Sequence, residues 1–72
     1  MPIKISEHAK KQLKERYISR KRILEVVTNP DRVIVSFKNR RLRQKRFGGR
    51  ILEVVTVTEG SWITVVTAYI KK

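Results

Sequence analysis

Residues 32–70 read RVIVSFKNRRLRQKRFGGRILEVVTVTEGSWITVVTAYI, and this stretch decides the fold. It contains segments rich in Val, Ile, Thr and aromatic residues, which favour extended strands. Turn-forming residues separate them: Asn39-Arg40 fits a tight turn, Gly48-Gly49 is a strong signal for a two-residue hairpin, and Glu59-Gly60-Ser61 joins the last two segments. The sequence therefore predicts a four-stranded antiparallel meander. Its expected strands are Arg32–Lys38, Arg41–Phe47, Arg50–Glu59 and Trp62–Ile70.

The segment before this stretch has helical spacing instead. Ser6 is suited to cap a first helix and Ser19 a second, because a serine side chain can accept a hydrogen bond from the first helical turn. Asn29-Pro30 ends the second helix, since a residue before proline is steered away from helical angles. We expect an α+β fold, one domain over residues 1–72, with two helices on one sheet face and the other face free for a ligand. The first helix carries one apolar stripe, formed by Ala9, Leu13 and Tyr17, with Ile18 alongside.

The charge of the chain is strongly one-sided, with 18 Lys and Arg against 6 Asp and Glu and a formal charge of +12. Self-repulsion at this charge opposes compaction in so small a domain, so an acidic partner would stabilise the fold. RNA, DNA or an acidic protein fits this requirement. A membrane partner is not expected, because binding to a membrane surface usually requires a basic amphipathic helix with bulky apolar anchors.

Residue types that bind metals or form disulfides are scarce. The chain has no cysteine and a single histidine, His8, and its acids are scattered, so we expect neither a metal nor a cofactor. No apolar run approaches 18 residues, and the N-terminal residues lack the apolar segment of a secretory signal. These features predict a soluble, cytoplasmic protein.

The longest basic tract, Lys38–Arg50, holds seven cations and no acid. It lies between strand-like segments, so its charges are held in place rather than displayed on a loose tail. Two interpretations remain: contact with a phosphate backbone, or a charged strand that prevents edge-to-edge aggregation. In an extended strand the alternation of side chains separates two sets. Arg41, Arg43 and Lys45 point to one face, and Leu42, Gln44 and Arg46 point to the other.

His8, on the polar surface of the first helix, is the candidate for acid–base chemistry. Gln12 follows one turn later and Arg16 one turn after that, about 12 Å from His8 along the axis. An imidazole there is either a bystander or a general acid/base near neutral pH. In the last strand, Thr67 and Tyr69 can bind phosphate and stack on a base. Strict alternation would place both on the face of Ile63 and Val65, opposite Trp62, Thr64, Val66 and Ala68.

The chain resembles a family of small domains grouped with RelE-like toxins, within the metal-independent ribonucleases that include barnase and the colicin tRNases. The likeness covers nearly the whole chain. It is carried by His8-Ala9, Leu13, Arg16, Ile18, Asn29-Pro30, Arg46-Phe47-Gly48-Gly49, Leu52-Glu53-Val54-Val55 and Val65-Val66-Thr67-Ala68-Tyr69.

This resemblance implies two helices on a four-stranded antiparallel sheet and a toxin-like ribonuclease using the 2′-hydroxyl. By position it assigns catalytic roles to His8, Arg16, Arg46 and Thr67, while Gln12 stands where family members often have arginine. RNA and an acidic, antitoxin-like protein are the implied partners. The alternatives are a non-catalytic RNA- or DNA-binding module and a basic domain that docks on an acidic protein. The expected RNA-binding residues are Lys38, Arg40, Arg41, Arg43, Lys45, Arg50 and Tyr69, with Arg43 also assisting Arg46.

Overall fold

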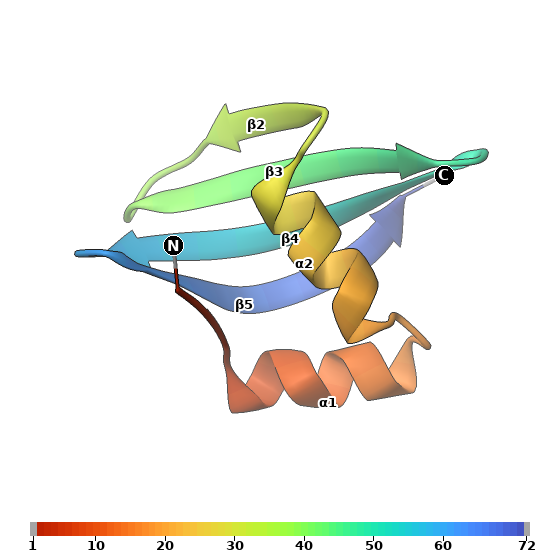
Figure 1. Cartoon of the computed structure of the whole chain (residues 1–72), viewed down its shortest axis with the longest axis horizontal. Coiled ribbons are helices and arrows are strands. Elements are labelled where there is room, and N and C mark those ends of the chain that lie inside the picture. The colour runs from red at the N-terminus through yellow and green to blue at the C-terminus, as the bar shows by residue number, and fades with distance from the viewer. Residues whose placement is uncertain (1, 72) are drawn as a thin grey trace.

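The computed structural model describes residues 2–71, which form a mixed sheet and two helices (Figure 1). In chain order the elements are β1 (Ile3–Ile5), α1 (Glu7–Glu15), α2 (Arg20–Thr28), β2 (Arg32–Val35), β3 (Arg40–Phe47), β4 (Arg50–Glu59) and β5 (Trp62–Lys71). The sheet order is β1-β5-β4-β3-β2. α2 crosses one sheet face over β3 and β4, and α1 runs beside β5 (Figure 1). The α+β class with two N-terminal helices is confirmed.

The prediction of four antiparallel strands is wrong in one respect, because β1 adds a fifth strand. β1 pairs in parallel with β5, whereas β2, β3, β4 and β5 pair antiparallel as expected. The Ser6 N–H donates to the Val65 carbonyl at 3.0 Å, which extends this contact to the start of α1. Three residues are too few to show a strand alternation in the sequence. β1 is a strand because it pairs with the edge of β5.

A β-bulge in β5 overturns the predicted faces of its residues. Val55 pairs with Thr67 but Thr56 pairs with Val65, so Val66 is an extra residue and the alternation reverses there. Ala68 therefore lies on the helix-covered face with Ile63 and Val65, all of them buried. Thr67 and Tyr69 point to the opposite face, which we call the open face.

Both predicted helix caps are confirmed. The Ser6 side chain accepts from the Ala9 N–H at 3.1 Å, and the Ser19 side chain accepts from the Arg22 N–H at 3.2 Å. These bonds satisfy amide groups that have no partner within the helix. The core between helices and sheet comprises Ile5, Ala9, Leu13, Ile18, Ile23, Val26, Val27, Leu52, Val54, Ile63, Val65 and Ala68.

The predicted apolar stripe of α1 is wrong at its last member. α1 ends at Glu15, Tyr17 adopts a φ of 55° and its side chain is 96 % exposed. The Ile18 N–H donates back to the Leu13 carbonyl at 2.9 Å, a bond that closes the helix through a residue in the left-handed region. Ile18 rather than Tyr17 then enters the core.

The turn before β3 also lies one residue earlier than predicted. Lys38 and Asn39 both have φ of 61°, the paired positive angles of a tight hairpin turn, so Arg40 already belongs to β3. The Gly48-Gly49 turn between β3 and β4 is confirmed. Within residues 2–71 no helix is long and apolar enough to cross a membrane.

Candidate functional site

The cations on the two faces of β3 make different contacts, and those of Arg43 lie on the helix-covered face. The register with β4 sets Arg43 opposite Val54 and Lys45 opposite Leu52, both of which lie in the core beneath the helices. The Arg43 guanidinium donates to the Val27 carbonyl and to the Thr56 hydroxyl, each at 3.1 Å. Burial, with a smaller effect from the neighbouring Arg41, lowers the pKa of Arg43.

Lys45 binds the same end of α2 as Arg43. Its ammonium donates to the Asn29 carbonyl at 3.0 Å and lies 3.6 Å from the Asp31 carboxylate. Carbonyl groups at a helix C-terminus attract cations through their own dipoles and the helix dipole. Arg43 and Lys45, both predicted to contact RNA, thus bind the end of α2 and lie on the face away from His8.

Asp31 connects this face to the edge of β3. Its carboxylate accepts from the Arg46 backbone N–H at 2.9 Å, just beyond the point where β2 pairing begins. This bond, together with the nearby Lys45 and Arg46 charges, lowers the pKa of Asp31. The contact uses the backbone of Arg46, so the Arg46 side chain remains exposed.

The open face contains a hollow that candidate residues from three elements line. His8 comes from α1, Arg40 from β3, and Thr67 and Tyr69 from β5. His8 reaches the hollow because β1 ends at Ile5 and α1 then runs beside β5. The remaining lining residues are Ser6, Ser36, Leu42, Val55 and Val66.

Side chains of α1 attach that helix to the edge of β5. The Arg16 guanidinium donates to the Ala68 carbonyl at 2.6 Å, and the Thr67 hydroxyl donates to the Gln12 side-chain oxygen. Arg16, predicted to be catalytic, therefore completes the hydrogen bonding of a strand edge and does not line the hollow. His8 is exposed, and it is the residue of α1 that lines the hollow.

The other predicted cations are spread around the sheet. Arg46 opposes Ile51 on the open face, and six residues of strand put it about 20 Å from Arg40. Lys38 is exposed in the β2–β3 turn, and Arg41 is exposed on the helix-covered side of β3. Arg46 is thus too far along the strand to share a phosphate with Arg40.

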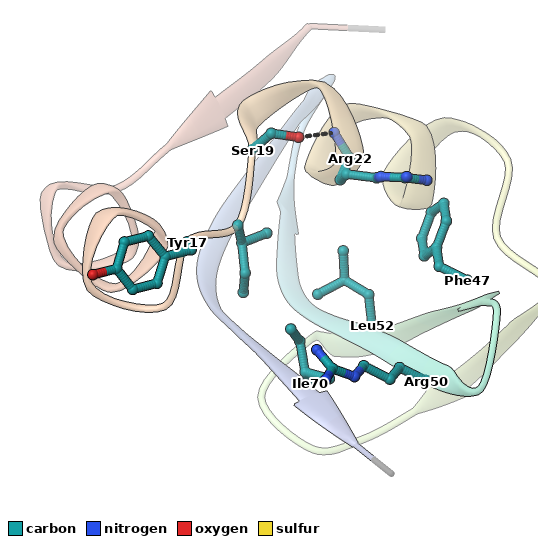
Figure 2. Close-up of a pocket in the computed structure, with 8 residues that line it drawn as sticks. Tyr17, Ser19, Arg22, Phe47, Arg50, Leu52 and Ile70 are labelled. Carbon is teal, nitrogen blue, oxygen red and sulfur yellow. Dashed lines mark hydrogen bonds between the residues drawn. The ribbon is translucent and has the colours of Figure 1, made fainter.

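Arg50 lies in a different, smaller hollow of about 240 Å³, formed by the α1–α2 connection and the β3–β4 hairpin. Figure 2 shows Arg22 beside the Phe47 ring, whose centroid lies 4.2 Å from the guanidinium carbon, and Tyr17 turned away from both. The apolar floor comprises Ile18, Leu52 and Ile70. Of the predicted RNA-binding residues, only Arg50 lines this hollow.

Sequence reasoning missed a buried charge on the open face. Glu53 is fully buried, its carboxylate accepts from the Gln44 side-chain amide and it lies 3.2 Å from the Lys71 ammonium. Its second oxygen has no hydrogen-bond partner among residues 2–71. The only available signal was an acid inside an apolar strand, in the segment ILEVV. Within the same residues, no three His, Cys, Asp or Glu side chains are grouped to hold a metal ion.

Residues 5–70 match the family described as a domain of unknown function (DUF4258). The match spans most of the chain, which therefore belongs to this family. No curated protein and no solved structure matches the chain.

Proposed function

We propose that this protein binds RNA on its open face and cleaves it without a metal ion, as a relative of the RelE-like toxins. The observation that carries the proposal is the hollow of the open face, which His8 and Arg40 both line from separate elements. An imidazole and a guanidinium around one cleft supply the two functions that this reaction needs. One moves protons, and the other neutralises charge on phosphate.

In this mechanism His8 accepts the proton of the RNA 2′-hydroxyl. The freed oxygen attacks the adjacent phosphorus, and the bond to the 5′-oxygen of the next nucleotide breaks as that oxygen takes up a proton from water. The products are a 2′,3′-cyclic phosphate and a 5′-hydroxyl. An imidazole is the side chain that most often performs such a proton transfer. Arg40 stabilises the negative charge that builds on the phosphate oxygens.

Other residues of the open face would hold the strand on either side. Tyr69 lines the hollow and offers a ring for base stacking. Thr67 donates to Gln12, so its hydroxyl oxygen remains an acceptor for an RNA 2′-hydroxyl. Arg46, about 20 Å along β3, would bind a flanking phosphate instead of the reacting one. This assignment moves the main charge-stabilising role from Arg46 to Arg40.

The test is cleavage of RNA by purified protein in EDTA, with products resolved by their end groups. Wild type should yield cyclic phosphate ends. His8→Ala should lose activity about 100-fold or more, the usual contribution of acid–base catalysis. Arg40→Ala should also lose activity, whereas Arg41→Ala removes the same charge from the other face and should cleave normally. Equal cleavage by wild type and His8→Ala would remove the histidine from the mechanism.

A non-catalytic RNA-binding module is the second candidate, favoured by one observation. Arg16 and Arg43, which were expected to support cleavage, are both occupied by hydrogen bonds to backbone carbonyls. Among residues 2–71, Arg40 is then the one Lys or Arg that lines the hollow with His8. This candidate predicts RNA binding that weakens steeply with salt, no cleavage products, and unchanged affinity in His8→Ala.

A further inference from the structure

β2 forms an edge of the sheet that carries an exposed apolar row. Val33 is 45 % exposed, Val35 is 76 % exposed, and Phe37 just beyond the strand is 84 % exposed. Figure 1 shows the reason, because α2 crosses β3 and β4 and leaves β2 beyond its reach. Proteins usually protect such an edge with charges or proline within the strand. In β2, Arg32 is the one charged residue, and the other three are Val33, Ile34 and Val35.

The backbone of this edge is also free to pair. The Ser36 N–H donates inward to the Arg40 carbonyl at 2.9 Å. Backbone groups alternate in direction along an antiparallel strand, so those of Val33 and Val35 point outward. Among residues 2–71, the only strand that pairs with β2 is β3, on its other side. The edge therefore offers two residues whose backbone groups and apolar side chains are both available.

The chemistry of this edge selects the kind of partner. A row of N–H and C=O groups pairs with another peptide backbone, and RNA has no equivalent row. A second copy of this chain would bring +12 against +12. The side chains around the apolar row are also basic, namely Arg32 in the strand, Lys38 after it and Arg41 paired with Val35. The complementary partner is an extended acidic segment with alternating apolar residues.

We propose that the free edge of β2 binds such an acidic segment of another protein as an added antiparallel strand. Its apolar side chains cover Val33, Val35 and Phe37 on the helix-covered side, and its carboxylates point to the open face, the side on which Arg32 lies. This interaction surface lies at the edge opposite α1 and does not depend on RNA cleavage or RNA binding on the open face.

The probe is a nine-residue peptide in which glutamate and valine alternate, titrated into ¹⁵N-labelled protein. In the antiparallel register that stacks its valines on Val33 and Val35, the valine N–H groups face β2 and the glutamate N–H groups face solvent. Two isomeric peptides of equal charge are then compared. One is N-methylated at its valines and the other at its glutamates. The valine-methylated isomer should bind about tenfold more weakly, since it loses its hydrogen bonds to β2. Equal affinity would overturn the proposal.

Hydrogen exchange and two protein variants locate the contact. Bound peptide should slow exchange of the Val33 and Val35 amides about tenfold or more. Val35→Pro removes an outward N–H from an edge strand, where proline is tolerated, and should weaken binding about tenfold. Val35→Thr keeps that N–H and should bind more tightly than Val35→Pro. Unchanged exchange on peptide addition overturns the proposal, as does protection of these amides in the free protein that disappears on dilution, which indicates self-pairing.

Discussion

The helix-covered and open faces of β3 carry cations from one basic tract, but they differ in what lies opposite them. On the helix-covered face, Arg43 and Lys45 meet the carbonyl groups at the end of α2. On the open face, Arg40 borders a hollow beside His8, and Arg46 is exposed. The first pair is satisfied within the protein, whereas the second pair is available to an anion.

This difference shows that charge density alone does not locate a binding surface. An arginine close to free carbonyl groups contributes to the fold, and one without them is available to phosphate. Arg40, Arg43 and Lys45 were all predicted from the sequence to bind RNA. The structure divides them by strand alternation and by the position of a helix C-terminus.

The largest effect on stability should come from Arg43→Ala. The substitution removes the hydrogen bonds to Val27 and Thr56. A partly buried charged donor of this kind contributes about 2 kcal/mol, or a fall in Tm of roughly 8–16 °C in a domain of this size. Thermal unfolding followed by circular dichroism measures the effect. Arg41→Ala is the control for relief of charge repulsion and should leave Tm within about 3 °C. Equal Tm values for the two variants would contradict the structural role given to Arg43.

Lys71→Ala should give the next largest effect, because this open-face cation makes a structural ion pair. It leaves the buried Glu53 carboxylate without its ion-pair partner. Because Lys71 is half exposed, we expect a loss of about 1–2 kcal/mol, less than for a fully buried pair. The double variant Lys71→Ala/Glu53→Gln should recover most of the lost stability, measured as the free energy of unfolding in urea or as Tm in thermal unfolding. If it does not, Lys71 contributes through packing rather than charge.

Arg40→Ala should change RNA binding with little effect on Tm. Loss of one phosphate contact reduces the slope of log affinity against log salt by about 0.7 on single-stranded RNA. Fluorescence anisotropy of a labelled oligonucleotide over a series of salt concentrations gives this slope. The matched Arg41→Ala variant should keep the wild-type slope, and a similar reduction in both variants would indicate diffuse attraction without a defined face.

The smallest effect should be the pH dependence contributed by Asp31. Its pKa is lowered in the folded state by the Arg46 N–H and by nearby cations. The stabilisation is therefore fully present above the unfolded-state pKa, about 3.9, and is lost as the pH falls through the lower folded-state value. Asp31→Asn should have a lower Tm than wild type at pH 6, and this gap should narrow below about pH 4. A gap that is constant with pH would indicate a neutral hydrogen bond.

Much of the fold follows from local signals in the sequence. Ser6 and Ser19 cap helices because their side chains reach amides three residues ahead, and Gly48-Gly49 makes a turn by itself. β1 could not be predicted, because it forms on an edge supplied by residues far along the chain. The bulge at Val66 escaped prediction for a similar reason, since it is a property of the pairing of β4 with β5.

The candidate site was only partly predictable. His8, Arg40, Thr67 and Tyr69 were all selected from the sequence, but the hollow that unites them depends on that bulge and on α1 lying beside β5. The contacts that occupy Arg16 and Arg43 involve the carbonyl groups of Ala68 and Val27. Backbone acceptors leave no trace in residue types, so these arginines looked equivalent to Arg40.

Binding of RNA to the open face of the sheet can be tested by an NMR titration of ¹⁵N-labelled protein with a short single-stranded RNA. His8→Ala protein is used so that the RNA stays intact. The account predicts saturable shifts at Arg40, Leu42, Thr67 and Tyr69, with little change at Arg43, Lys45 and the residues of α2. Shifts concentrated on α2, Arg43 and Lys45, with the residues of the open face unchanged, would contradict RNA binding on the open face.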